Sequence, residues 1–483
     1  MSLIKENDAV VERRSLVQEV AELLRRGNVL LQAYPGWGKT RLATLLASEF
    51  KRVVIVERTI EEMREVALMS PVRVVPLYGR EKVCPLMREA EDGGLHLPSH
   101  VFCRVQRLFS ACRYKYEATS ELARFHASAF RSPDELIEEA RRTGVCPYPT
   151  VVTLKKSSRV VATYGFVFHH GDVLEDRDLV VFDEAHTLVE AVAESVKVYD
   201  EQYVEFIVEK LKRSKATRGL AYAVKQCWRR SSSFREFAEC LERQPVSTEE
   251  VDELIREYRS KRSYAEGKAL YVVPSLQLAG ERGALFLSSY VPPFILDHVP
   301  NATVIDVPPP STRLRAIIDD SLTSRYRERS DDVYRGYAEK IAEYASSNEA
   351  NLVLFPSYEF MERVKSHLPS SILSRVVPRE VVRTAGPGDI VFDVAGGTTT
   401  EGINPSPHLR RVIVCGLPYP PPSPILNALA SLYGFDNVYT YMALQRVVQA
   451  IGRTRLRAGS LAVLIDRRYR AVLRFFPSFI SVE

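Results

Sequence analysis

The chain has 483 residues and a formal net charge of +5, with 46% hydrophobic and 26% charged residues. This is the composition of a folded globular protein, and it excludes a disordered, collagen-like or disulfide-dense chain. No apolar run approaches the roughly 18 residues that span a bilayer, and residues 1–8 contain no apolar signal region. We therefore expect a protein without membrane contact, in the cytoplasm or, in a eukaryote, in the nucleus. The length predicts about three domains, because a domain commonly has about 150 residues.

The predicted elements alternate short β-branched strands with helices, which indicates an α/β fold with parallel strands. The predicted strands are residues 29–31, 53–56, 160–162, 179–182, 284–287, 351–355, 389–392, 411–414 and 461–465. Two stretches interrupt the alternation. Residues 77–150 contain four cysteines and few strand signals, and residues 195–268 carry Glu, Lys and Arg at helical spacing.

The first candidate site is the segment 33–40, which follows the first predicted strand and opens a helix. This context is typical of a P-loop that binds ATP. Gly36 and Gly38 permit the tight backbone that directs N–H groups at phosphate, Lys39 reaches the β- and γ-phosphates, and Thr40 is a ligand of Mg²⁺. The alternative is a chance glycine-rich turn.

Two carboxylates follow the predicted strand 179–182 in the sequence Asp-Glu-Ala-His. Asp183 can hold Mg²⁺ through its waters, and Glu184 can polarise the water that attacks a phosphate. His186 suits a coupling hydrogen bond better than a role as a base. By itself this tetrapeptide also fits a coincidental strand end, but together with the P-loop it indicates NTP hydrolysis.

A helix near the C-terminus carries Gln449, Arg453 and Arg455 just before the last predicted strand. Arginines in this place can reach across a domain cleft to a γ-phosphate, and Gln449 can assist in binding the nucleotide. The alternative is an arginine-rich surface helix. A Gly/Thr loop over residues 396–404 can offer N–H groups and hydroxyls to phosphates, or it can be a plain loop.

In this order, the segments resemble the helicases of superfamily 2 and, within it, the iron–sulfur XPD/DinG-like family. They resemble its archaeal XPD-like members with a shortened arch. The matching segments are 33–40 (motif I), 57–59 (Ia), 183–186 (II), 285–290 (III), 354–358 (IV), 396–404 (V), 416–419 (after V) and 449–455 (VI). The resemblance covers nearly the whole chain and implies two RecA-like P-loop NTPase domains, the first with an iron–sulfur insertion and a small helical arch.

The resemblance also predicts the domain boundaries. The first RecA-like domain comprises three segments, the iron–sulfur domain and the arch are inserted between them, and the second RecA-like domain follows. The boundaries are 1–76, 151–194 and 269–300 for the first domain, 77–150 for the iron–sulfur domain, 195–268 for the arch, and 301–483 for the second domain.

Seven cysteines in a reducing compartment are expected to stay unpaired. Four of them, Cys84, Cys103, Cys112 and Cys146, are candidate metal ligands, whereas the scattered Cys227, Cys240 and Cys415 are expected to be ordinary thiols. The resemblance assigns the first four to a [4Fe–4S] cluster, which four thiolates commonly hold. Their long spacings are unlike short zinc knuckles, although zinc or four unligated thiols remain alternatives.

Residues 100–116 combine basic and aromatic side chains without an acid. Arg104, Arg107 and Arg113 can follow phosphates, and Tyr114 can stack on an unpaired base. The alternative is a helix whose aromatic residues face the core and whose arginines are solvated. Arg58, in the segment that resembles motif Ia, is a further candidate DNA contact.

The sequence therefore predicts an ATP-dependent DNA helicase that uses ATP, Mg²⁺ and a [4Fe–4S] cluster. The resemblance implies 5′→3′ movement of a monomer on single-stranded and forked DNA, with repair as the setting. Tyr290, Asn404 and Leu456 depart from the family pattern in motifs III, V and VI. These departures motivate two alternatives: a DNA-stimulated ATPase that translocates without separating strands, and an inactive nucleic-acid-binding scaffold.

Overall fold

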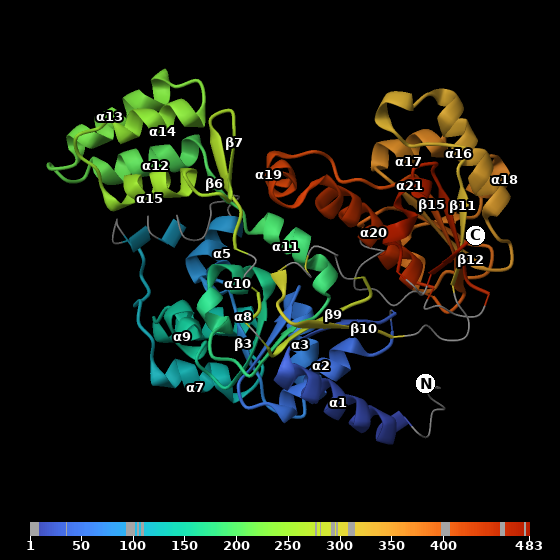
Figure 1. Cartoon of the computed structure of the whole chain (residues 1–483), viewed down its shortest axis with the longest axis horizontal. Helices are drawn as coiled ribbons and strands as arrows, with labels where there is room; N and C mark the ends of the chain where they lie inside the picture. The colour runs from blue at the N-terminus through green and yellow to red at the C-terminus, as the bar shows by residue number, and fades with distance from the viewer. Residues whose placement is uncertain are drawn as a thin grey trace.

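The computed structural model is built around two seven-stranded parallel sheets (Figure 1). It describes residues 9–34, 36–92, 102–103, 106–107, 111–275, 278–280, 282–290, 295, 298–307, 314–397, 406–454, 459–477 and 480–483. Every strand predicted from the sequence is present. Within these residues, no helix combines the length and the apolar character that crossing a membrane requires.

The first sheet has the strand order β10-β1-β9-β5-β2-β4-β3, with all neighbours parallel. Its strands are β1 (Asn28–Gln32), β2 (Val53–Glu57), β3 (Val75–Leu77), β4 (Arg159–Thr163), β5 (Leu179–Phe182), β9 (Ala284–Ser288) and β10 (Ala302–Asp306). β2, β5 and β9 are buried throughout. Continuous apolar strands are what a sheet covered on both faces requires.

Helices cover both faces of this sheet. The helices α1 (Ala9–Arg26), α2 (Lys39–Glu49) and α3 (Ile60–Met69) pack on one face, where alternate strand residues share one apolar cluster with them. The helices α10 (Tyr164–His169) and α11 (Leu188–Glu194) pack on the opposite face. Successive side chains of a strand point to opposite faces, so each strand supplies both clusters.

The boundary predicted at residue 300 is wrong by one strand. β10 pairs in parallel with β1, from Asn28 opposite Ala302 to Gln32 opposite Asp306, so it belongs to the first sheet. Sequence patterning missed it because its residues are largely exposed at the sheet edge. The second domain therefore begins after this strand.

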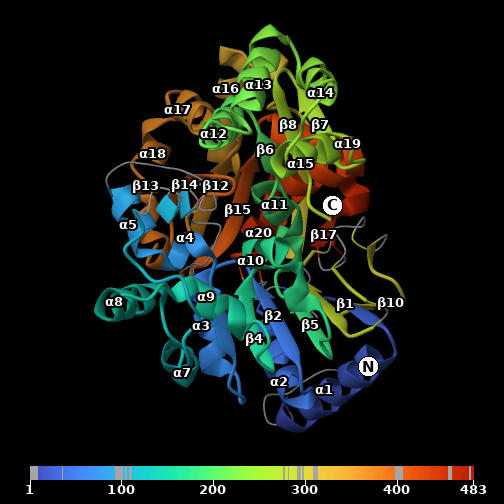
Figure 2. The ribbon, with the colours of Figure 1, turned by 90° about the vertical axis from the view of Figure 1, so that its left-hand side faces the viewer.

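The second sheet has the order β13-β14-β12-β15-β16-β11-β17. Its strands are β11 (Leu314–Asp319), β12 (Ala350–Phe355), β13 (Val376–Val377), β14 (Ile390–Val394), β15 (Leu409–Cys415), β16 (Leu461–Ile465) and β17 (Ile480–Val482). One face packs against α16 (Asp331–Tyr344) and α17 (Tyr358–Lys365). The other face packs against α19 (Pro424–Tyr433) and α20 (Tyr441–Gly452), which lie towards the first sheet (Figure 2).

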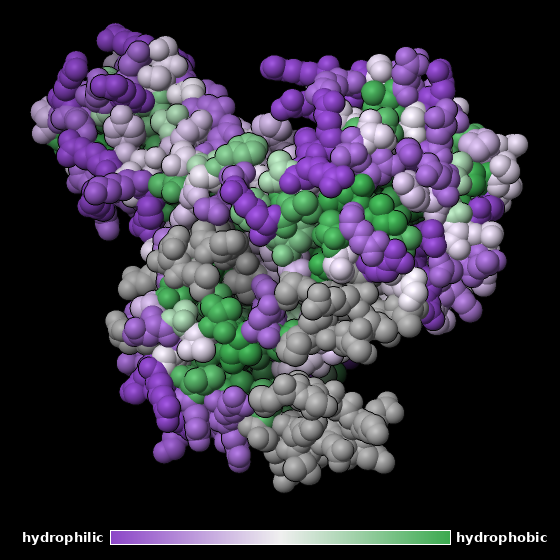
Figure 3. Space-filling view, turned by 45° about the vertical axis from the view of Figure 1, so that its right-hand side comes forward, coloured by the Kyte–Doolittle hydropathy of each residue, from purple (hydrophilic) through white to green (hydrophobic). Residues whose placement is uncertain are grey.

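A helical domain interrupts the first sheet's chain between α11 and β9. The helices α12 (Glu201–Leu211), α13 (Arg218–Arg230), α14 (Phe234–Glu242) and α15 (Glu249–Tyr258) enclose an apolar cluster of their own. The domain is completed by the antiparallel strands β6 (Lys197–Tyr199), β8 (Ala269–Val272) and β7 (Ser263–Glu266), so it extends beyond the limit of 268 predicted from the sequence. Figure 3 shows a notch between this domain and the second domain.

Cys227 and Cys240 form a disulfide that joins α13 to α14. The expectation of unpaired thiols is therefore wrong at these two positions. The two cysteines lie on neighbouring helices with their Cα atoms 5.6 Å apart, a separation at which a disulfide forms readily. Cys415 is free and buried, as expected.

The four-cysteine region lies beside the edge strand β3. It contains α4 (Arg80–Val83), α5 (Pro85–Asp92), α7 (Ser120–Ser128), α8 (Pro133–Thr143) and α9 (Pro147–Leu154). Caps define these helices locally, because Ser132 forms a capping box with Glu135 and Pro133 occupies the first turn of α8. A bridge between Lys115 and Val145 holds the middle of the region beside its C-terminal part.

Candidate active site and cysteine cavity

The phosphate-binding loop lies between β1 and α2. Gly36 and Gly38 have φ angles of +85° and +102°, a left-handed conformation that side chains with a Cβ rarely adopt. No atom lies within 4 Å of a Cβ added at either position, so backbone conformation, not space, requires glycine here. Lys39 begins α2 and is buried. The N-terminus of this helix offers N–H groups and a positive dipole end to an anion.

Asp183 follows β5 at the carboxyl edge of the sheet and is 0% exposed. The Thr40 hydroxyl acts to lower the pKa of its carboxylate, so the two side chains lie close together, whereas the Asp183 Oδ2 atom has no hydrogen-bond partner within the described residues. Tyr164 donates from its hydroxyl to the Asp183 carbonyl at 2.7 Å and fixes the strand end. A buried carboxylate oxygen without a donor beside a threonine hydroxyl fits the oxygen ligands that Mg²⁺ prefers.

Glu184 has a left-handed backbone with φ at +46°, which is uncommon for a residue other than glycine. The conformation is held by Thr187, whose N–H and hydroxyl both donate to the Glu184 carbonyl, at 2.8 and 2.9 Å. The Glu184 N–H donates to Asp183 Oδ1 at 2.9 Å. Such conformations persist only where the surroundings enforce them, and here they set the direction of the Glu184 carboxylate.

The two carboxyl groups titrate in opposite directions. Burial, and then the charge of Glu184, raise the pKa of Asp183. Burial also acts to raise the pKa of Glu184, but the charges of Lys39, His186 and Arg453 outweigh it and lower that pKa below its usual value. Glu184 is therefore ionised at neutral pH, as a group that takes a proton from water must be.

His186 connects the first domain to the second. Its Nδ1 atom lies 3.0 Å from Glu184 Oε2 and 3.1 Å from Ser288 Oγ. Its Nε2 atom lies 2.8 Å from the amide nitrogen of Gln449, on α20 of the second domain. The Nε2 atom thus faces the Gln449 amide, and Nδ1 faces Glu184 and Ser288.

The arginines of motif VI are only partly described. Arg453 follows α20 directly and lies near enough to Glu184 for its charge to lower the pKa of that carboxyl. Arg455 lies outside the described residues. The structure thus brings Lys39, Asp183, Glu184, Gln449 and Arg453 to one interface between the two domains.

The four candidate metal ligands line one cavity. Cys84, Cys103, Cys112 and Cys146 surround it together with Arg80, and about 390 Å³ of empty space lies inside, some of it open to solvent. Burial raises the pKa of Cys84 and Cys146, and the charges of the other cysteines add to the effect. Across the described residues, no three His, Cys, Asp or Glu side chains are arranged tightly enough for a single metal ion.

Two family models match this chain, one in each of its two sheet domains. The family model of the helicase C-terminal domain matches residues 341–478, and the DEAD_2 model matches residues 52–202. The ATP-dependent DNA helicase XPD of Sulfolobus acidocaldarius is 31% identical over 170 residues, in an alignment that covers 31% of each chain. The aligned part therefore spans about a third of that relative.

Two solved structures share the fold. An XPD helicase structure matches with a TM-score of 0.60 and 20% identity over 100% of both chains. The structure of S. tokodaii Xpd4 matches with a TM-score of 0.52 and 19% identity, covering 98% of this chain and 99% of the other. The chain is thus similar to XPD helicases in its two matched domains and in its fold. Its two sheets are the two α/β domains of that fold.

The candidate DNA contacts of this chain differ in their exposure to solvent. Tyr114 is 8% exposed and packs in the apolar cluster of the first domain, so its ring cannot stack on a base here. The alternative of core-facing aromatic residues is correct for this position. Arg113 is exposed and pairs with Glu89 at 2.5 Å, and Arg107 lies 4.2 Å from the ring centroid of Tyr116.

The two other candidates lie apart from this segment or outside the described structure. Arg58 lies near the nucleotide site, where it pairs with Glu190 on α11 at 3.3 Å. Arg104 lies outside the described residues. Whether these arginines contact DNA stays a prediction.

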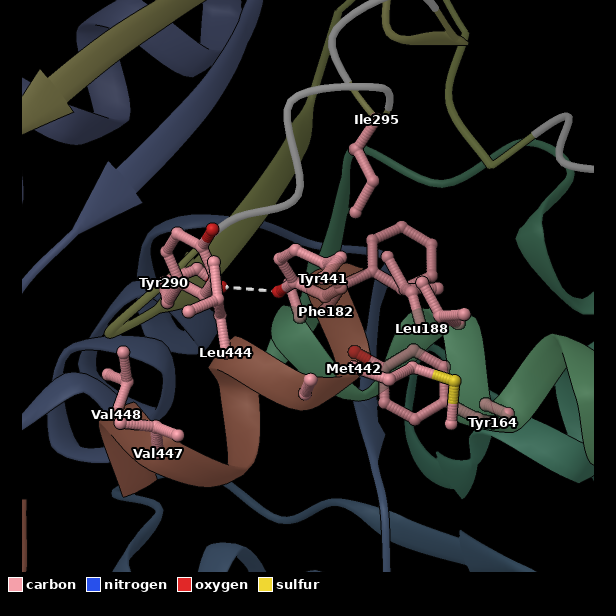
Figure 4. Packing of buried hydrophobic residues seen from close by; sticks show 14 of the residues in the cluster. Tyr164, Phe182, Leu188, Tyr290, Ile295, Tyr441, Met442, Leu444, Val447 and Val448 are labelled. Carbon is pink, nitrogen blue, oxygen red and sulfur yellow. Dashed lines mark hydrogen bonds between the residues drawn. The ribbon is translucent and has the colours of Figure 1, made fainter. Parts of the chain in front are cut away.

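Sequence reasoning missed two groups at the site. Glu57 ends β2 beside Asp183 and is 1% exposed, and burial, followed by the charge of Asp183, raises its pKa well above the usual value. Tyr441 begins α20 and donates a hydrogen bond to the Tyr290 carbonyl of the first domain (Figure 4). Tyr441 and Gln449 are eight residues, or about two helical turns, apart. This spacing was the only sequence signal that they lie on the same face of one helix.

Proposed function

We propose that this protein is an ATP-dependent DNA helicase that moves 5′→3′ on single-stranded DNA and separates duplex, with DNA repair as its setting. The observation that carries the proposal is the contact between Gln449 and His186, 2.8 Å apart across the domain interface. It connects the carboxylates that would act on ATP to a helix of the other domain. Hydrolysis at this interface can therefore change the position of one domain relative to the other, which is what movement along DNA requires.

The roles of the residues follow from their positions. Lys39 would bind the β- and γ-phosphates, and Thr40 with Asp183 would hold Mg²⁺, which neutralises phosphate charge when bound. Glu184 would orient and deprotonate the attacking water, since its carboxylate is ionised. Arg453, with Arg455, would approach the γ-phosphate from the second domain and stabilise the charge that develops there.

The four-cysteine cavity would hold a [4Fe–4S] cluster. Four thiols from three separate stretches of chain line the cavity, and among the described residues no three His, Cys, Asp or Glu side chains form a site for a metal ion. This combination favours a cluster over zinc, because a cluster's own body keeps its four thiolates further apart than a single ion does. Arg80 lines the same cavity and would offset part of the thiolate charge. The cluster would serve to fix this region, which otherwise has a small apolar core.

The remaining assignments follow the family. Residues 197–272 would form a reduced arch, and the notch between this domain and the second domain would admit one DNA strand (Figure 3). Arg58, Arg104, Arg107 and Arg113 would contact the DNA backbone. The protein would act as a cytoplasmic monomer, or in the nucleus of a eukaryote, on single-stranded and forked DNA, without membrane contact.

A strand-displacement assay tests the proposal. Protein purified without oxygen is given ATP and forks that carry either a 5′ or a 3′ single-stranded tail. We expect displacement from 5′-tailed forks, and loss of both displacement and DNA-stimulated ATP hydrolysis in Lys39→Ala. Displacement only from 3′ tails would overturn the polarity, and Lys39→Ala with wild-type hydrolysis would overturn the active site.

A second candidate function is translocation without strand separation. It is favoured by Tyr290, which stands where the family usually has threonine in motif III and which packs against Tyr441 of the second domain. The same assay distinguishes the two functions: DNA-stimulated hydrolysis without displacement on either fork supports the translocase. A protein that binds DNA but hydrolyses no ATP would instead be a scaffold.

The cluster has its own test. Anaerobically purified protein is expected to contain about four iron atoms per chain and to absorb visible light, and Cys84→Ser is expected to lose both. Stoichiometric zinc in a colourless protein would overturn the assignment. The iron content is measured without reference to helicase activity, so the two proposals can fail separately.

A further inference from the structure

Tyr441 and Tyr290 form a contact across the domain interface that the roles assigned so far do not use. Their ring centroids are 4.9 Å apart with an angle of 23° between the planes. The Tyr441 hydroxyl donates to the Tyr290 carbonyl at 2.8 Å (Figure 4). Both side chains are buried, with 3% and 5% of their surface exposed. A hydrogen bond in such surroundings is stronger than on the surface.

The acceptor of this bond belongs to a turn that touches the active site. Ser288 closes the turn, because its hydroxyl donates to the Tyr290 carbonyl at 2.9 Å and accepts from the Tyr290 N–H at 3.0 Å. The same hydroxyl lies 3.1 Å from His186 Nδ1. Tyr441 is thus separated from the histidine beside Glu184 by one carbonyl and one hydroxyl.

Helix α20 contacts the first domain at two points. Tyr441 stands at its first position, and Gln449 follows two turns later, about 12 Å along the helix axis. Gln449 contacts the His186 ring at 2.8 Å, and Tyr441 Oη also lies 3.5 Å from the His186 carbonyl. Two attachments define the direction of the helix as well as its distance, so α20 cannot pivot freely about Gln449.

We propose that Tyr441 is a positioning residue that links the movement of α20 to the motif III turn and, through Ser288, to His186. The proposal rests on the proposed ATP-driven function and names a coupling contact within it. When the interface closes, the Tyr441 hydroxyl fixes the Tyr290 carbonyl and holds the Ser288 turn against His186. When the interface opens, the bond breaks and the turn is released.

The tyrosine pair supplies its own matched control. The Tyr290 hydroxyl is buried but has no hydrogen-bond partner within the described structure, so Tyr290→Phe removes a group that contributes no contact. Tyr441→Phe makes the same chemical change on the other ring of the stack and removes the bond across the interface. Both variants keep the apolar packing, and only one breaks the link.

The test compares the two variants in ATP hydrolysis saturated with single-stranded DNA. Tyr441→Phe is expected to lower kcat about tenfold, with KM for ATP within twofold of the wild type, since the buried hydrogen bond across the interface is lost. Tyr290→Phe is expected to stay within twofold of the wild type in both constants. Turnover is expressed per nucleotide-binding protein, and thermal melting verifies that both variants are folded.

Three results would overturn the proposal. In the first, the kcat of both variants equals that of the wild type; in the second, the kcat of both falls by the same factor; in the third, the Tyr441→Phe defect is confined to KM. If Tyr441→Phe does not fold, Ser288→Ala breaks the same relay from the first domain, and it must then lower kcat more than Ser289→Ala does. Wild-type protein is measured first. If DNA does not stimulate its hydrolysis, the proposed function fails, whereas a stimulated wild type with indistinguishable variants refutes only the role of Tyr441.

Discussion

Breaking the disulfide between Cys227 and Cys240 is expected to destabilise the helical domain without unfolding the rest of the chain. The bridge spans 13 residues and joins α13 to α14. This domain has an apolar cluster separate from those of the two sheets, so it has the means to unfold as its own unit. The perturbation is reduction of the wild type or the double substitution Cys227→Ala and Cys240→Ala.

The magnitude follows from the length of the closed loop. Closing about 13 residues removes chain entropy from the unfolded state that is worth about 3 kcal/mol at 25 °C. For a domain of this size, 1 kcal/mol shifts the Tm by about 4–8 °C, so the helical domain should melt roughly 12–24 °C lower without the bridge. In the described residues of the two sheet domains, every cysteine is free. The melting of these domains should therefore not respond to a reductant.

Two measurements check this prediction. Alkylation in denaturant without a reductant should label five of the seven cysteines and leave two protected. Hydrogen exchange, followed by peptide, should rise in α13 and α14 on reduction and remain unchanged in β2 and β5. The doubly substituted protein is the control, because a reductant should not affect its melting. Labelling of all seven cysteines, or a helical domain whose exchange ignores reductant, would refute the reasoning.

Three further predictions concern the active site and the dependence of stability on pH. Gln449→Ala should lower kcat of ATP hydrolysis about 10- to 100-fold, because the buried His186 ring loses its partner; an unchanged steady-state rate would contradict the contact. Glu184→Gln should lower hydrolysis by about 10²- to 10⁴-fold while a fluorescent ATP analogue still binds, and loss of binding would reassign the residue. Burial, followed by the charge of Lys155, lowers the pKa of His170 to about 4, below its unfolded value of about 6.5. Protonation therefore favours the unfolded chain, and stability should fall between pH 6.5 and 4. Urea unfolding of His170→Gln should show a smaller fall, and equal slopes would refute the assignment.

The sequence by itself was enough to predict the glycine-rich loop with its helix start and the buried strands. A P-loop is a local structure, because the left-handed glycines, the lysine and the helix start all lie within residues 33–40. Strands buried on both faces are likewise legible as short β-branched runs. The order of the motifs along the chain was also enough to identify the family. These features share one property, which is that their signal lies in adjacent residues.

Other features depended on which distant residues meet, and only the tertiary structure decided them. The edge strand β10 gains its place from pairing with β1, since its own pattern is weak. Tyr114 lies in a basic and aromatic segment that is typical of base stacking, but the packing around it buries the ring. The pairing of Cys227 with Cys240 depends on two helices lying side by side. The contact of Tyr441 with the motif III turn joins residues 151 positions apart; no local pattern specifies such a contact, because it exists only when two separately folded sheets close on each other.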